Sequence, residues 1–399
     1  MSDDPFLRTR ELFELPSGVI YLDGNSLGPM TTRARRRVVH ELTESWGGQL
    51  IRAWNTAGWI DLPARVGDKI ADLIGAPWGS VIAADSTSIN LYKALIAALR
   101  LAPTRRLILS DSGNFPTDLY IAEGVAATLG ASHRLKVVAP EDVEAHIGED
   151  VAALMLTQVD YRTGRLHDMA RLTEKAKAVG VVAVWDLAHS AGALPVDLTA
   201  CGVDFAVGCG YKYLNGGPGA PAFIYVRPDL QTEAAAALSG WMGHEAPFDF
   251  DLRYRPAPNI DRFRAGTPAV LSMACLDAAL DAFGGVDTNQ LRTRSIELSE
   301  AFRARVEALC PELTLASPRD PAARGSQISF RFPDGYAAIQ ALIARGVIGD
   351  FRSPDIMRFG FTPLYLSMSD VLAAADTIGE VIRDRAWDTP EFRARNKVT

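Results

Sequence analysis

The stretch Val181-Val182-Ala183-Val184-Trp185-Asp186-Leu187-Ala188-His189 is an apolar run that ends in a carboxylate and a histidine. Its valine-rich core is typical of a buried β-strand. On both sides of it, short β-rich runs alternate with helix-length amphipathic segments from about residue 80 to residue 227. This alternation predicts an α/β layer fold with a mostly parallel sheet. The expected strands lie at 106–109, 136–138, 152–156, 181–184, 205–207 and 222–226.

The pattern changes near residue 290, where an α+β arrangement begins and indicates a second domain. The first 60 residues open irregularly and then predict one helix at 32–46. We therefore expect an N-terminal extension over 1–60, a large α/β domain over 61–290 and a small α+β domain over 291–399. The tail predicts helices at 269–283, 289–309, 336–345 and 369–386, and strands at 327–332 and within 347–360.

Composition excludes several classes of protein. The 399 residues are 48% apolar and 22% charged, which is typical of a globular enzyme rather than a disordered chain. The net charge is −7 and the basic residues are scattered, so we expect no nucleic-acid partner. No apolar run approaches the roughly 18 residues of a membrane span. The acidic opening, residues 1–5, predicts no targeting segment.

The cysteines and histidines indicate a reducing compartment and argue against a metal-binding site. The four cysteines have neither zinc-site spacing nor disulfide density, which favours a reducing, cytoplasmic compartment. The six histidines show no metal-ligand spacing, so we expect no metal.

Lysine is scarce, with seven against 34 arginines, and Lys212 differs from the other six in its setting. It follows an apolar strand and precedes the turn Tyr213-Leu214-Asn215-Gly216-Gly217. A partly desolvated amine at that place would have a lowered pKa and could act as a Schiff-base nucleophile. The alternative interpretation is a lysine that snorkels from a turn to solvent.

Other side chains at strand ends favour the functional interpretation of Lys212. Asp186 could cap a helix, but beside a Schiff-base lysine it fits the residue that keeps the pyridine nitrogen of pyridoxal phosphate protonated. Thr87 and Ser88 open an apolar helix, where hydroxyls and free amides bind a phosphate or simply cap the helix. Phe115 could stack on the cofactor ring and Asp118 could approach its polar edge; otherwise they are a core residue and a cap.

Five segments together resemble the kynureninases, which are fold-type I pyridoxal 5′-phosphate enzymes of tryptophan catabolism. The resemblance runs from about residue 20 to residue 385 and implies a seven-stranded, mostly parallel sheet. The Asp186 and Lys212 pair is general to the superfamily, whereas the segments as a set point to this family. They are Tyr21 to Gly28, Phe115 to Asp118, Trp185 to His189, Tyr211 to Asn215 and Gly240 to Glu245.

The resemblance assigns a role to each matching residue. Lys212 would carry the cofactor, Asp186 would pair with its ring nitrogen, and His189, Phe115 and Asp118 would lie against its ring. The phosphate would be held by Thr87, Ser88 and Tyr211, with Thr157 at a further pocket position. Trp241 and Thr267 would reach the phosphate from a neighbouring subunit, so the resemblance implies a homodimer; some kynureninases carry Asn at the Thr267 position.

The substrate would be L-kynurenine, or its 3-hydroxy form, which is hydrolysed to anthranilate and L-alanine. Its α-carboxylate calls for an arginine, and Arg358 in an apolar strand matches the family's carboxylate-binding position. Ser26 matches a substrate-cavity position. Lys212 would move the Cα proton, and Tyr211 would transfer a proton during carbon–carbon cleavage.

Three other interpretations stay open to different degrees. An aminotransferase or another lyase of the same superfamily, acting on a small amino acid, shares the lysine and the aspartate, and the aminotransferase would depend on a keto acid. A cysteine desulfurase needs a nucleophilic cysteine in the small domain, and the chain has none after Cys310. A cofactor-binding regulator without catalysis would need a nucleic-acid footprint, which the charge pattern does not provide.

Overall fold

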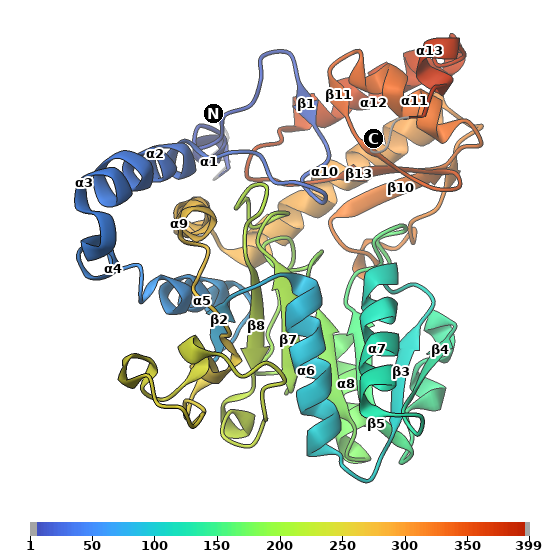
Figure 1. The fold of residues 1–399 in the computed structure, drawn as a ribbon. Coiled ribbons are helices and arrows are strands. Elements are labelled where there is room, and N and C mark those ends of the chain that lie inside the picture. The colour runs from blue at the N-terminus through green and yellow to red at the C-terminus, as the bar shows by residue number, and fades with distance from the viewer. Residues whose placement is uncertain (1–5, 396–399) are drawn as a thin grey trace.

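The computed structural model describes residues 6–395, and a seven-stranded sheet forms its centre (Figure 1). The strand order is β2-β8-β7-β6-β5-β3-β4, with β8 antiparallel to both of its neighbours and the other pairings parallel. The expected mostly parallel sheet is confirmed. Its strands are β2 (Val81–Ala83), β3 (Leu107–Asp111), β4 (Arg134–Val138), β5 (Val151–Thr157), β6 (Val182–Asp186), β7 (Phe205–Cys209) and β8 (Ala222–Val226).

Helices cover both faces of this sheet because its strands are apolar on both sides. Along β6, Val184 faces one hydrophobic cluster, whereas Ala183 and Trp185 face another. The first cluster is covered by α6 (Thr87–Leu101) together with α7 (Pro116–Leu129). The second is covered by α5 (Leu62–Leu73), α8 (Met169–Ala178) and α9 (Val270–Ala279). Because the parallel strands run in one direction, their carboxyl ends meet at one edge of the sheet, where α/β folds bind ligands.

A second, antiparallel sheet of four strands follows in the order β12-β13-β10-β9. Its strands are β9 (Thr314–Leu315), β10 (Gln327–Arg331), β12 (Asp350–Arg352) and β13 (Ile356–Gly360). Two helices pack on it, α10 (Thr288–Leu309) and α11 (Gly335–Ile343). Two more pack on these helices, α12 (Met368–Arg383) on both and α13 (Pro390–Arg393) on α11. The chain passes from one sheet to the other at α10 (Figure 1), and the domain bounds given above stay a prediction.

The N-terminal segment joins the two sheets. β1 (Ile20–Tyr21) pairs in parallel with β11 (Val347–Ile348), and α2 (Thr32–His40) packs on α9. Between them, the Gly28 amide donates to the Tyr211 carbonyl at 2.8 Å, and a Cβ on Gly28 would collide with the Lys212 carbonyl. Glycine is therefore required where this segment crosses the strand end that carries the lysine.

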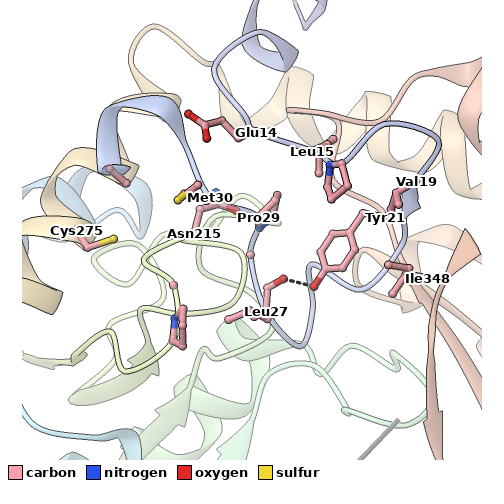
Figure 2. A pocket seen from close by; sticks show the side chains of 15 residues that line it. Glu14, Leu15, Val19, Tyr21, Leu27, Pro29, Met30, Asn215, Cys275 and Ile348 are labelled. Carbon is pink, nitrogen blue, oxygen red and sulfur yellow. Dashed lines mark hydrogen bonds between the residues drawn. The ribbon is translucent and has the colours of Figure 1, made fainter. Parts of the chain in front are cut away.

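An apolar cavity of about 340 Å³ lies beside this crossing (Figure 2). The Tyr21 hydroxyl donates to the Leu27 carbonyl at 2.7 Å and so closes a loop around it. Met30 and Cys275 form the opposite side. The hydrogen bond joins the two ends of the segment 21–27, which contains Ser26.

The remaining helical turns are short. The predicted helix at 32–46 is α2 followed by a π-helical stretch, η1 (Glu41–Trp46). No helix within residues 6–395 is long and apolar enough to cross a membrane. The acidic opening, residues 1–5, lies outside the described residues. The short elements are α1 (Leu7–Arg10), α3 (Gly47–Gln49), η2 (Leu50–Arg52), α4 (Ala53–Thr56), η3 (Pro140–Asp142), η4 (Glu144–His146), η5 (Pro228–Leu230), η6 (Trp241–Gly243), η7 (Pro247–Asp249), η8 (Ile260–Phe263), η9 (Leu280–Phe283) and η10 (Pro321–Ala323).

Candidate active site

Lys212 and His189 meet at the carboxyl edge of the large sheet. Lys212 follows β7 and His189 follows β6, and the lysine Nζ lies 3.0 Å from the histidine Nε2. Burial and the nearby Lys212 charge hold the pKa of His189 well below its usual value, so the imidazole is neutral. Its Nε2 can then accept from the lysine ammonium, which leaves the proton on Nδ1. That Nδ1 is buried and has no hydrogen-bond partner among the described residues.

Two buried carboxyl groups lie against each other beside this lysine. Asp186 ends β6, and its Oδ1 accepts from the Ala188 amide at 2.6 Å. Asp118, in the first turn of α7, is 3% exposed, and its Oδ2 has no partner among residues 6–395. Burial raises the pKa of both carboxyls, and the charge of Asp186 raises that of Asp118 further. Asp118 Oδ2 is therefore the oxygen of this pair that lacks a hydrogen-bond donor within the described residues.

The start of α6 forms the polar end of the same cavity. Thr87 and Ser88 open the helix and line the cavity with Tyr211, while the Ser86 hydroxyl accepts from the Ile89 amide at 3.4 Å. Free amides and hydroxyls at a helix N-terminus favour an anion. The arrangement is suited to a phosphate group.

An ion pair whose lysine is fully buried supports that helix start. The chain enters α6 through Asp85, which has a left-handed backbone with φ of 49°. Its carboxylate is held by Lys93, which is 0% exposed and also donates to the Phe263 carbonyl at 2.6 Å. The sequence analysis did not single out Lys93, because a lysine within a helix is usually a surface residue.

An aromatic wall closes the cavity on another side. Phe115 is 42% exposed, and its ring meets the Tyr161 ring edge-on with centroids 5.1 Å apart. Thr157 lies at the end of β5, directly opposite Asp186 in the strand register. Tyr161 was missed by the sequence reasoning, although its place four residues after a strand end was the available signal. The cavity is lined by Thr87, Ser88, Phe115, Thr117, Asp118, Thr157, Tyr161, Asp186, Ala188, His189, Tyr211 and Lys212.

The predicted carboxylate-binding residues form a separate cluster in the smaller sheet. Arg358 is 1% exposed; its Nη2 donates to the Ser26 hydroxyl at 2.6 Å and to the Asp350 carboxylate. Its Nη1 donates to the Tyr161 carbonyl at 2.7 Å, which ties the cluster to the cavity wall. Arg352 pairs with the same Asp350 at 2.8 Å. Sequence reasoning named Arg358 and Ser26 but missed Asp350 and Arg352.

Two predicted residues lie elsewhere. Trp241, on η6, is 40% exposed and packs against Phe248 and Phe250, and Thr267 is also exposed. Neither lines the cavity of its own chain. Their exposure is compatible with a role toward another copy of the chain.

The residues of the cavity fit pyridoxal phosphate. The group needs an amine, an acidic partner for its ring nitrogen, a flat apolar contact and an anion site. Lys212 supplies the amine, Asp186 the acid, Phe115 the flat contact and the start of α6 the anion site. The unpaired Asp118 Oδ2 and His189 Nδ1 are the buried polar atoms that such a ligand would engage.

Sequence comparison reveals close relatives over the whole chain. The family model for the kynureninase C-terminal domain matches residues 291–378. The kynureninase of Pseudomonas fluorescens is 49% identical over 405 aligned residues, which cover 100% of this chain and 97% of that protein. The kynureninase of Burkholderia pseudomallei strain 1106a is 49% identical over 404 residues, with the same coverage.

Solved structures share the fold at lower identity. The apo structure of a cysteine desulfurase from Thermococcus onnurineus NA1 matches with a TM-score of 0.79 at 19% identity, covering 95% of this chain and 98% of that one. A variant of the protein C-DES, with glycine covalently linked to its pyridoxal phosphate cofactor, matches with a TM-score of 0.79 at 19% identity, covering 93% and 99%. These likenesses establish the fold type.

Proposed function

The chain belongs to the kynureninase family, and from that premise we propose that it hydrolyses L-kynurenine to anthranilate and L-alanine with pyridoxal 5′-phosphate as cofactor. The observation that carries the proposal is the 49% identity over the full chain. The cavity around Lys212 supports it independently, because its amine, acid, aromatic contact and anion site match what the cofactor requires.

When bound, the cofactor supplies an electron sink that stabilises negative charge at the substrate's α-carbon. Asp186 would keep that sink effective by holding a proton on the ring nitrogen, and its burial keeps water from competing for this hydrogen bond. Phe115 would fix the plane of the ring, and Thr87, Ser88 and Tyr211 would hold the phosphate. Thr157 would line the part of the cavity next to Asp186.

Lys212 and Tyr211 would move the protons. Lys212 is the base for the Cα proton, and the neutral His189 at 3.0 Å orients its amine without adding a second charge. Burial raises the pKa of Tyr211 above its usual value, so its phenol stays protonated and can donate. Water provides the oxygen that becomes part of the anthranilate carboxylate, and Cβ takes a proton as the Cβ–Cγ bond breaks.

Water labelled with heavy oxygen tests this reaction without a keto acid present. We expect equal amounts of anthranilate and L-alanine, with one labelled oxygen in each anthranilate. An aminotransferase would instead require a keto acid and would leave the carbon skeleton intact. Keto-acid dependence with no anthranilate would refute the proposed reaction while leaving the cofactor site unaffected.

We further propose a homodimer with shared sites, in which Trp241 and Thr267 reach the partner's cofactor phosphate. The exposed apolar residues around Trp241 support it, since monomeric proteins rarely leave such a cluster uncovered. They include Phe248, Phe250 and Leu252, which are 59%, 73% and 102% exposed. The four free cysteines support a reducing, cytoplasmic location.

Mixing two defective variants tests the shared site. Trp241→Ala weakens cofactor binding and Lys212→Ala removes the amine, yet a hybrid dimer would contain one site with both residues intact. We expect the mixture to regain tight cofactor binding and activity after subunit exchange. No recovery in a mixture shown to contain hybrids would place Trp241 in its own chain's site.

A further inference from the structure

The arginine assigned to the substrate carboxylate is already neutralised by its own chain. Arg358 forms an ion pair with Asp350, and these two side chains are 1% and 3% exposed. Both terminal nitrogens of Arg358 have partners, because Ser26 and the Tyr161 carbonyl accept the other hydrogen bonds. A buried pair of opposite charges has no net charge with which to attract an anion. Arg358 alone is therefore a poor explanation for carboxylate binding.

Arg352 changes the charge of this cluster. It is two residues from Asp350 on β12, so both side chains emerge on the same face of the strand. Its Nη2 lies 2.8 Å from the Asp350 Oδ2 that Arg358 also contacts. Two guanidinium groups thus share one carboxylate, and the three side chains sum to a single positive charge.

Arg352 is also the accessible member of the three. Its side chain is 37% exposed, whereas Arg358 and Asp350 are almost completely covered. Its buried Nε, like that of Arg358, has no hydrogen-bond partner among residues 6–395. The two neighbouring guanidinium groups thus each keep an unpaired N–H donor, and an anion with two oxygens could accept from both.

The charge of Arg352 reaches the cofactor cavity. Its charge adds slightly to the lowering of the His189 pKa and weakly opposes the rise in the Tyr211 pKa, which burial dominates. Both residues line the cavity that contains Lys212. Arg352 is also connected to the cavity wall, because it shares Asp350 with Arg358, whose Nη1 donates to the carbonyl of the lining residue Tyr161 at 2.7 Å.

We propose that Arg352 is a second substrate-recognising residue, which supplies the net positive charge that draws the α-carboxylate of the amino acid into the cluster. Arg358, fixed by Asp350, Ser26 and the Tyr161 carbonyl, then provides the rigid donor. This inference rests on the proposed function, since it takes L-kynurenine as the substrate. It predicts selectivity for ligands with a free α-carboxylate.

The test compares Arg352→Gln and Arg352→Lys with the control Arg331→Gln. Arg331 lies on β10 of the same sheet, pairs with Asp355 at 3.0 Å and is 51% exposed, but has no part in the cluster. Two ligands are used: L-kynurenine and its amine analogue without the carboxylate. Anthranilate release gives KM and kcat for the first, and titration of the cofactor's absorbance gives the affinity for both.

Arg352→Gln should raise KM and the dissociation constant for L-kynurenine about 10- to 100-fold, as for loss of a hydrogen bond to a charged group. Its affinity for the amine analogue should stay unchanged, and Arg352→Lys should recover most of the loss. Arg331→Gln should match the unsubstituted protein. Unchanged KM in Arg352→Gln, or an equal loss for both ligands, would overturn the inference. Absence of anthranilate release by the unsubstituted protein would instead refute the proposed function.

Discussion

The cofactor cavity and the carboxylate cluster differ in how their charged groups are paired: like charges are adjacent in the cavity, and opposite charges are paired in the cluster. In the cavity, Asp118 and Asp186 place two carboxyl groups together and leave polar atoms unpaired. In the cluster, Asp350 lies between Arg352 and Arg358, so its carboxylate offsets one of their two positive charges and holds both arginines in place. The cavity is therefore incomplete without a ligand, whereas the cluster is ordered before any substrate arrives.

This difference has a physical reason. A cofactor that stays bound can supply permanent partners, so the cavity can tolerate buried groups that would otherwise cost about 1–3 kcal/mol each. A substrate comes and goes, so the cluster must be stable in its absence. An internal carboxylate that holds the arginines meets that need, at the cost of part of their attraction for the substrate.

The largest expected effect comes from removing the amine of the cavity. Lys212→Ala should lower kcat at least about 10³-fold, since both the nucleophile and the base are lost. It should also abolish the long-wavelength absorbance band of the bound cofactor. Lys177→Ala, at an exposed helical position, is the control. Near-normal turnover with an intact absorbance band in Lys212→Ala would show that this cavity is not the cofactor site.

Removing the buried arginine of the cluster, Arg358, should affect the binding of the substrate more than the rate of its cleavage. Arg358→Ala breaks a buried pair and leaves Asp350 with Arg352 alone, which costs about 2–5 kcal/mol in comparable cases. We expect a rise in KM of about 30-fold or more, with a smaller change in kcat. Steady-state kinetics measure it, with Arg331→Gln as control. An unaltered KM would show that the cluster does not bind the carboxylate.

The crowded carboxyls of the cavity predict a pH effect on the apoprotein. The folded-state pKa values of Asp118 and Asp186 are raised, so their contribution to stability is present at low pH and is lost as the pH rises through those values. Asp118→Asn should therefore stabilise the apoprotein at about pH 8 by roughly 1 kcal/mol or more. It should also make the stability of the apoprotein less dependent on pH.

Thermal unfolding of apoprotein between about pH 5 and pH 8 checks this prediction. The exposed Asp150→Asn is the matched control. The advantage should shrink once pyridoxal phosphate is bound, because the ligand supplies the missing partner. Identical pH profiles for Asp118→Asn and the unsubstituted apoprotein would mean that the two carboxyls do not repel each other.

The smallest expected effect concerns Asp23, at the edge of the cluster. Burial and the Asp350 charge raise its pKa to about 7. Above that pH its ionisation would cancel the net positive charge of the cluster, so KM for L-kynurenine should rise up to about tenfold as the pH increases through 7. The groups that face Asp23 are Ser26 in its own turn, Asp350 and Arg352 on β12, Arg358 on β13, and the phenols of Tyr21, Tyr213 and Tyr365.

Asp23→Asn should remove this rise while preserving affinity at neutral pH. The pH dependence of KM, compared with that of binding of the carboxylate-free amine, measures it. A rise of the same size in Asp23→Asn would assign the titration to another group.

The two regions also differ in how far the sequence predicts them. Lys212, Asp186 and His189 follow apolar strands of a parallel sheet, and the ends of such strands meet at one edge. Local patterns therefore sufficed to bring Lys212 and Asp186 together, whereas Thr157 came from the family resemblance and Tyr161 was missed. The short strand β2 was missed because three residues carry little periodicity.

The cluster depends on contacts that no local pattern contains. Asp350 faces Arg358 only through the antiparallel register of β12 with β13, and Ser26 comes from more than 300 residues away. Lys93 illustrates the same limit, because α6 is buried on nearly all sides and its one internal lysine looks like a surface residue in sequence. The roles of Trp241 and Thr267 depend on a second chain and came only from the family resemblance.

The most direct test of the proposed active site is to find which lysine holds the cofactor. Borohydride reduction of the holoenzyme fixes pyridoxal phosphate on its lysine, and mass spectrometry of the peptides locates it among the seven lysines. We expect modification of Lys212 alone, and none in Lys212→Ala. Modification of another lysine, such as Lys93, or no modification of a cofactor-loaded protein, would contradict it.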